Sequence, residues 1–213
     1  EIMNIFNKKI LVLAPHTDDA EFGCGATIVK LKEQGNEIFC AAFSACKQSV
    51  LSEFPDDILI TEVKEASKIL GISQENLVLF DYDVRTFSYN RQKILDDIIK
   101  LKKNLKPDII FIPSLNDLHQ DHSTIANEAF RAFKFSTVLC YELPWNNIVF
   151  STTFFVELNQ KHLDLKIAAI SKYKSQQHRP YSKRKFIEAL AEVRGTQINK
   201  QYAECFEVLR IIL

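Results

Sequence analysis

The chain has 213 residues, of which 46% are hydrophobic and 25% charged, and its 27 Lys+Arg balance 27 Asp+Glu. This length favours a single domain spanning residues 1–213, and the apolar fraction excludes a largely disordered chain. The zero net charge argues against a nucleic-acid partner bound through a basic face. No apolar run reaches the roughly 18–20 residues that a membrane-spanning helix needs.

Apolar runs of the buried-strand type alternate along the chain with stretches of helical periodicity. The predicted strands are residues 9–15, 38–43, 77–80, 108–113, 137–143, 152–158 and 203–212. The predicted helices are residues 20–34, 56–70, 90–105, 121–134, 160–176 and 183–200. This alternation predicts an α/β fold: a Rossmann-like, doubly wound, mostly parallel sheet with helices on both faces.

Five cysteines occur at positions 24, 40, 46, 140 and 205, with no CxxC pair. An odd number without metal-binding spacing indicates free thiols rather than a disulfide framework. The first residues lack a basic segment followed by an apolar stretch, so no signal peptide is expected. We therefore expect a cytoplasmic protein with reduced cysteines, of which Cys24 and Cys46 are not metal ligands.

The loop after the first predicted strand holds a histidine and three acids within six residues, His16-Thr17-Asp18-Asp19-Ala20-Glu21. Like charges this close repel one another, and a bound cation would relieve the repulsion. One tight turn can aim His16 and Asp19 at a single point, and an imidazole with a carboxylate suits zinc or a similar divalent ion. The alternative is that the aspartates merely cap the next helix, whose dipole favours acidic residues.

The loop after the fourth predicted strand contains His119, Asp121 and His122. Taken alone, it also fits a polar loop in which Asp121 caps a helix. In a doubly wound sheet, however, the first and fourth strands can lie side by side at the switch point, where ligands bind. The two clusters would then meet, and His16, Asp19 and His122 can supply three ligands to a catalytic metal that keeps one open position.

Asp18 and His119 remain beside the predicted metal, one from each cluster. A carboxylate next to the metal's water can act as a general base, and an imidazole can stabilise an oxyanion. These groups suit the addition of water to a carbonyl, so amide or ester hydrolysis is the expected reaction. Zinc is the default cofactor, and Fe(II) or another divalent ion could use the same ligands.

These residues also carry a resemblance to a known family. The segment from Pro15 to Thr27 resembles the opening motif of the PIG-L/LmbE-like zinc-dependent N-deacetylases, and residues 119–122 resemble their second motif, HxDH. Arg194-Gly195 followed by Tyr202-Ala203-Glu204-Cys205-Phe206 is similar to their C-terminal signature. That family removes acetyl groups from N-acetylglucosamine-type sugars in lipid-, inositol-, malate- or nucleotide-linked form. The resemblance therefore implies a small N-acetylated amino-sugar conjugate as substrate.

The resemblance also implies residue roles at the matching positions. His16, Asp19 and His122 match the family's metal ligands, and Asp18 matches its general base. His119 matches the histidine that helps bind and polarise the carbonyl group. On this reading Asp18 and His119 are the catalytic residues.

Four further residues are candidate substrate contacts: Arg85, Asp121, Ser44 and Trp145. Arg85 and Ser44 follow predicted strands at the functional edge, and an arginine there can hold a hydroxyl or a phosphate group. Trp145 is the only Trp, and sugars stack on aromatic faces, although a core position fits equally well. His162 is expected at the surface. A nucleotide-linked substrate and a homo-oligomer are further candidates.

Three other functions compete with deacetylation. Two histidines and one carboxylate also describe a non-haem iron oxygenase, although such triads commonly occupy β-rich scaffolds. A non-catalytic sugar-binding domain of the same fold would not need Asp18 and His119. A nicotinamide dehydrogenase would need a glycine-rich fingerprint, and Gly23-Cys24-Gly25 lacks the correctly spaced third glycine.

Overall fold

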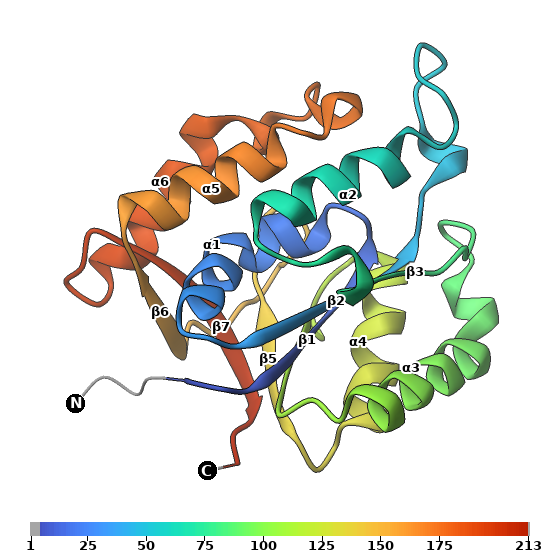
Figure 1. The fold of residues 1–213 in the computed structure, drawn as a ribbon, viewed down its shortest axis with the longest axis horizontal. Helices are drawn as coiled ribbons and strands as arrows, with labels where there is room; N and C mark the ends of the chain where they lie inside the picture. Colours follow the sequence, from blue (N-terminus) through green and yellow to red (C-terminus); the bar gives the residue numbers. More distant parts are fainter. Residues whose placement is uncertain (1–4, 213) are drawn as a thin grey trace.

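The computed structural model describes residues 5–212. Within this range seven strands form one sheet in the order β3-β2-β1-β4-β5-β7-β6 (Figure 1). From β3 to β5 in this order, adjacent strands run parallel to one another. Strand β7 runs antiparallel to both β5 and β6. The predicted α/β fold with a mostly parallel, doubly wound sheet is confirmed. The expected absence of a signal peptide concerns the first residues of the chain, and residues 1–4 lie outside the described residues.

The elements alternate along the chain much as the apolar pattern predicts. The strands are β1 (Lys9–His16), β2 (Glu37–Ser44), β3 (Leu77–Leu79), β4 (Ile109–Pro113), β5 (Thr137–Tyr141), β6 (Phe154–Leu158) and β7 (Tyr202–Arg210). The helices are α1 (Asp19–Glu33), α2 (Ile58–Ile69), α3 (Arg91–Leu105), α4 (Gln120–Ala132), α5 (Gln160–Ile170) and α6 (Arg184–Thr196).

The sheet is covered on both faces (Figure 1): α1, α2, α5 and α6 lie on one side and α3 and α4 on the other. Successive side chains of β1 alternate between the two cores. Ile10, Val12 and Ala14 belong to the first core, and Leu11 and Leu13 belong to the second. Burial on both faces explains why β1 reads as a continuous apolar run. Its central place between β2 and β4 brings the loops after β1 and β4 to the same edge.

Two helices, α5 and α6, end at least four residues earlier than predicted. The chain leaves α5 after Ile170 because it turns to bury Tyr173, whose hydroxyl donates to the carbonyl oxygen of Thr17 at 2.6 Å. After α6 the carbonyl of Gly195 accepts the backbone N–H of Lys200 at 2.9 Å and closes a tight turn. A Cβ at Gly195 would lie 2.6 Å from the carbonyl oxygen of Gln201, so this turn requires glycine.

The expectation that His162 lies at the surface is wrong. It is buried, and its ring closes a capping box with Asn159 at the start of α5. Its Nε2 lies 2.8 Å from the carboxylate of Glu33. A polar residue in the first turn of a helix satisfies backbone groups that would otherwise lack partners, which is why this histidine is folded inward.

Two further expectations concern free cysteine thiols and the lack of a membrane-spanning helix. All five cysteines are buried and have free thiols. No helix among residues 5–212 is both long and apolar enough to cross a membrane.

Candidate active site

The carboxyl end of β1 carries His16 and a tight turn that leads into α1. The backbone N–H of His16 donates to Asp19 Oδ2 at 2.8 Å, which folds the Asp19 carboxylate back toward the end of the strand. Asp18 occupies the position just before α1, but its side chain makes no capping hydrogen bond. The capping alternative therefore does not account for the Asp18 carboxylate.

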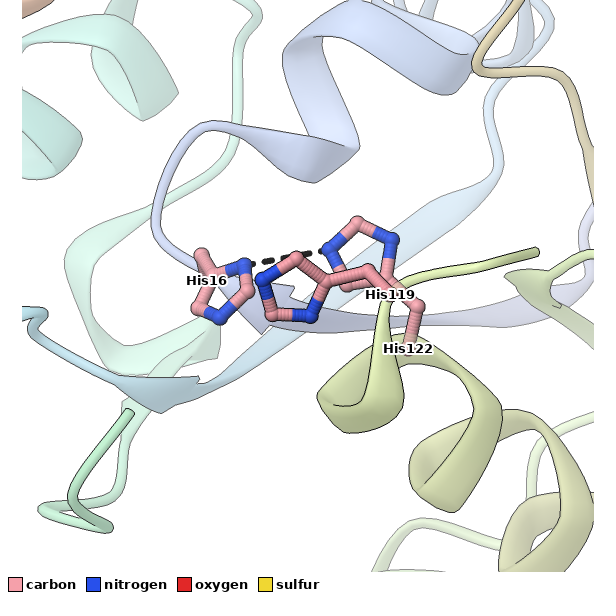
Figure 2. Close-up of side chains that lie close together, drawn as sticks. All are labelled: His16, His119 and His122. Atoms are coloured by element: carbon pink, nitrogen blue, oxygen red, sulfur yellow. Dashed lines mark hydrogen bonds between the residues drawn. The ribbon is translucent and has the colours of Figure 1, made fainter. Parts of the chain in front are cut away.

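The second cluster lies at the start of α4, beside the end of β4. His119 precedes the helix, and its Nδ1 accepts the backbone N–H of Asp121 at 3.2 Å. His122 is buried one turn further on. Because β1 and β4 are neighbours in the sheet, the two clusters meet, and Figure 2 shows the imidazoles of His16, His119 and His122 gathered at this point.

Three potential ligand atoms converge there: His16 Nδ1, Asp19 Oδ2 and His122 Nε2. His122 Nε2 lies 3.1 Å from His16 Nδ1 and 3.2 Å from Asp19 Oδ2. Asp19 Oδ2 lies 3.2 Å from His16 Nδ1. Ligand atoms about 2.0–2.1 Å from a tetrahedral zinc stand roughly 3.3–3.4 Å apart. A divalent cation therefore fits this triangle with little rearrangement.

His119 is a competing third ligand, because one nitrogen from each of His16, His119 and His122 lies within 4.8 Å of the others. The triangle that contains Asp19 is tighter, with no side longer than 3.2 Å. Asp19 also brings a negative charge, which neutral imidazoles lack. Geometry and charge thus both favour Asp19 over His119 as the third ligand.

A buried carboxylate contacts each of the two histidines on the nitrogen that faces away from the triangle. Asp121 Oδ2 lies 3.2 Å from His16 Nε2, and Asp117 Oδ2 lies 2.8 Å from His122 Nδ1. We infer that these nitrogens carry the ring protons, which leaves the lone pairs of His16 Nδ1 and His122 Nε2 for the triangle. Metal-binding histidines are commonly oriented in this way.

The electrostatics of the cluster favour positive charge at the triangle. Burial alone would lower the pKa of His122, but the charges and hydrogen bonds of Asp19 and Asp117 raise it to about 10. Burial would raise the pKa of Asp19, yet His122 and His16 hold it well below its usual value. A divalent cation bound by these groups would replace protons in balancing the carboxylates.

Asp18 and His119 border the triangle without being needed as ligands. Burial, followed by the neighbouring charge of Asp19, raises the pKa of Asp18 to about 6. Burial, followed by the charges of His16 and His122, lowers the pKa of His119. Since His119 Nδ1 accepts a backbone N–H, the neutral ring carries its proton on Nε2 and can donate a hydrogen bond.

A cavity of about 360 Å³ opens over the triangle. Among the residues that line it are Asp18, His119, Arg85 and Trp145. Trp145 stacks on Tyr181, with ring centroids 3.9 Å apart and planes 6° from parallel. Sequence reasoning missed Tyr181, because this residue lies in the connection between α5 and α6, away from any strand end. The cavity thus combines acid–base groups with an aromatic surface.

Two predicted substrate contacts do not line this cavity. Ser44 is 1% exposed, and its hydroxyl accepts the backbone N–H of Cys46 at 3.0 Å. Asp121 is fully buried, and its carboxylate accepts the backbone N–H of Arg85 at 2.6 Å besides contacting His16. Ser44 is the last residue of β2 and Asp121 lies in the first turn of α4. At both positions the side chain points into the protein. They support the site rather than face it.

The chain is similar to known proteins in sequence and in structure. It is 29% identical over 175 residues to the "Uncharacterized deacetylase YaiS" of Escherichia coli (strain K12), which covers 79% of this chain and 91% of that protein. Among solved structures, the N,N'-diacetylchitobiose deacetylase from Pyrococcus horikoshii superposes with a TM-score of 0.80 at 23% identity, over 95% of this chain and 84% of that one. The 4-carboxy-2-hydroxymuconate hydratase GalB from Pseudomonas putida KT2440 reaches a TM-score of 0.79 at 20% identity, over 97% of this chain and 98% of that one. At these identities the structural likenesses establish the fold alone.

The sequence profile of the PIG-L family, described as GlcNAc-PI de-N-acetylase, matches residues 11–133. This span runs from β1 through α4 and so contains both clusters of the site. The resemblance seen in the motifs is confirmed: the chain belongs to the PIG-L family of deacetylases.

Proposed function

We propose that this protein is a metal-dependent hydrolase that removes the N-acetyl group from an N-acetylated amino sugar or its conjugate. His16, Asp19 and His122 hold the cation. The observation that carries this proposal is the triangle of ligand atoms with sides of 3.1–3.2 Å. Zinc is the expected ion, because nitrogen and carboxylate ligands in a site with an open position are typical of catalytic zinc.

A bound divalent cation lowers the pKa of water toward 7 and polarises a carbonyl oxygen. Asp18 is placed to take a proton from the water that attacks the acetyl carbon and to return it to the departing amine. Its pKa of about 6 suits a base that works near neutral pH. His119 donates its Nε2 proton in a hydrogen bond to the oxygen that becomes negative as the tetrahedral intermediate forms.

The cavity walls support a sugar as substrate. A volume of about 360 Å³ lies within the range of small-molecule sites. The stacked pair of Trp145 and Tyr181, with Phe22 packed edge-on against both rings, forms a rigid aromatic surface beside the catalytic groups. The N,N'-diacetylchitobiose named for the structural relative is an N-acetylated amino sugar of this kind.

Release of acetate tests this function. The purified protein is incubated with a panel of N-acetylated sugars and their phosphate, nucleotide and glycoside conjugates, with zinc or with a chelator. We expect acetate and a free amine from at least one conjugate, and loss of the reaction with the chelator that is restored by added zinc. Activity that persists after complete metal removal would contradict the proposal.

The alternative functions make different predictions. An iron oxygenase would consume oxygen with a 2-oxo acid, and a sugar-binding domain would bind the conjugate without releasing acetate. Nothing in the geometry favours either over hydrolysis, because Asp18 and His119 both border the cavity. A cytoplasmic location, supported by the five free thiols, and a homo-oligomer, which light scattering would detect, also remain proposals.

A further inference from the structure

Two arginines in the cavity lack the acidic partner that most arginines of this protein have. Arg91, Arg131, Arg184 and Arg194 each form an ion pair with an aspartate or a glutamate. Arg85 and Arg179 both line the cavity. Within residues 5–212, neither guanidinium has a carboxylate oxygen within 4.0 Å.

Arg179 is held in place by a chain of buried hydrogen bonds that begins on α2. The carboxylate of Glu62 accepts the backbone N–H of Ser175 at 3.0 Å and its hydroxyl at 2.6 Å. Gln176 Nε2 donates to the Ser175 hydroxyl oxygen at 3.3 Å, and Gln176 Oε1 accepts from Arg179 Nε at 2.8 Å. The side chains of Glu62, Ser175 and Gln176 are all buried, so this chain fixes the direction of the arginine before any ligand arrives.

The chain of hydrogen bonds occupies only Nε of Arg179. Its guanidinium carbon lies 5.8 Å from the centre of the Tyr181 ring, which is part of the aromatic surface of the cavity. The Tyr181 hydroxyl is a further hydrogen-bond partner of the Arg179 side chain, and among the described residues no carboxylate oxygen lies within 4.0 Å of its terminal nitrogens. Two adjacent N–H donors on a rigid plane match the oxygens of a phosphate or a carboxylate.

Arg85 approaches the cavity from the loop after β3. Its backbone has φ of +66°, a left-handed conformation that is uncommon outside glycine. The buried carboxylate of Asp121 accepts the Arg85 backbone N–H and stabilises this conformation. The Arg85 guanidinium has a single polar contact with a described side chain, a long one of 3.4 Å to the Ser49 hydroxyl. Strained backbone held by buried groups is a recurring feature of ligand-binding loops.

We propose that Arg179, with Arg85 as a second contact, binds an anionic group carried by the substrate, either a phosphate or a carboxylate. The substrate is then an anionic amino-sugar conjugate rather than a neutral N-acetylated sugar. This inference rests on the proposed function and specifies its substrate class. Glu62, Ser175 and Gln176 act as positioning residues, because their hydrogen bonds to one another and to Nε fix the side chain of Arg179.

The test measures binding with sugars that cannot be deacetylated, so that its result does not depend on the reaction. The zinc-loaded protein is titrated with glucose 1-phosphate, glucuronic acid and methyl glucoside by calorimetry. We expect at least one of the two anionic sugars to bind roughly tenfold or more tightly than methyl glucoside, because a charge-assisted bidentate contact is stronger than a neutral one. The two anions distinguish a phosphate site from a carboxylate site.

Three variants connect that preference to Arg179. Arg179→Gln should lose the preference for the anion and keep the affinity for methyl glucoside. Arg179→Lys should retain part of it, because the charge stays while the planar pair of donors is lost. Arg184→Gln removes an exposed arginine outside the cavity and should behave as the wild type. Equal zinc content and thermal midpoint in all variants shows that they are folded.

A wild-type protein that binds the anionic and neutral sugars equally would overturn this inference, and so would an unchanged preference in Arg179→Gln. An unchanged preference in Arg179→Gln would indicate that the anion binds the metal instead of Arg179. Acetate release from neutral substrates alone, without any anion preference, would also remove the anion site but leave the proposed deacetylase function intact.

Discussion

Two groups of buried charges in this protein differ in how their charges are balanced. In the first, between α1, α5 and β7, Lys166 Nζ donates to Glu204 Oε1 and to the carbonyl oxygen of Phe22, each at 2.6 Å. Glu204 also accepts the backbone N–H groups of Ala26 and Thr27, at 3.2 and 2.7 Å. One positive charge and one negative charge are paired there, and protein donors and acceptors surround them.

The second group lies where the loops after β1 and β4 meet. Asp18, Asp19, Asp117 and Asp121 surround three histidines, and no Lys or Arg side chain in residues 5–212 lies within 4.0 Å of these four carboxylates. Nitrogens of two imidazoles, His16 Nδ1 and His122 Nε2, converge on one carboxylate oxygen of Asp19 instead. A buried ion pair that is already balanced serves packing, whereas converging ligands that are short of positive charge indicate a cation site. Substitutions in the two groups should therefore have different consequences.

The largest effect is expected from His122→Ala, which removes one corner of the triangle. The variant should lose its bound metal and with it deacetylation above background, because the cation is needed to activate water. Elemental analysis per chain checks the metal, and circular dichroism checks the fold. His178→Ala, which removes an exposed histidine elsewhere, should keep one metal per chain. Full metal occupancy in His122→Ala would show that His122 is not a ligand.

The two adjacent aspartates should fail in different ways. Asp18→Asn keeps the shape of the side chain but removes the base, so kcat should fall by roughly 10²–10⁴ with the metal still bound. Asp19→Asn removes a charged ligand and should weaken metal binding instead. Kinetics and metal content are measured on both variants. If Asp18→Asn loses the metal and Asp19→Asn retains it, their roles are exchanged.

The pH dependence of kcat/KM should also depend on the Asp18 carboxylate, with a smaller effect than that of the Asp18→Asn substitution. Asp18 must be ionised to accept a proton, and its pKa is raised to about 6 by burial and by Asp19. A bound cation would lower that pKa, so pH 6 is the highest pH at which the fall in kcat/KM should begin. Below the pKa of Asp18, kcat/KM should fall about tenfold per pH unit. Initial rates between pH 4.5 and 8 test this expectation, with the range chosen to bracket about pH 6. A profile of the same shape in Asp18→Asn would assign the acidic limb to another group.

The smallest effect on activity is expected in the balanced pair. Lys166→Met leaves Glu204 buried without its partner and should destabilise the fold by about 3–5 kcal/mol. The folded variant should keep its metal and its kcat, because Lys166 contacts no residue of the triangle. Urea unfolding measures the stability, and adding Glu204→Gln should recover part of the loss. Loss of the metal in Lys166→Met would mean that the two groups are coupled.

Much of the site could be predicted because it lies at strand ends. The apolar runs locate β1 and β4, and the parallel topology then brings His16 and His122 together. The direction of a side chain is harder to predict. Asp121 neighbours His122 in sequence, yet the first turn of α4 points it into the protein. Arg179 could not be predicted, because it lies in a connection whose path over the sheet edge depends on the buried contact between Glu62 and Ser175.

The central claim is that His16, Asp19 and His122 hold one divalent cation, and a crystal structure of the zinc-loaded protein tests it most directly. Anomalous diffraction at the zinc edge should show one ion about 2.0–2.2 Å from His16 Nδ1, Asp19 Oδ2 and His122 Nε2, with the fourth position open to the cavity. An ion bound through His119 with Asp19 displaced, or no ion at this edge of the sheet, would contradict the account.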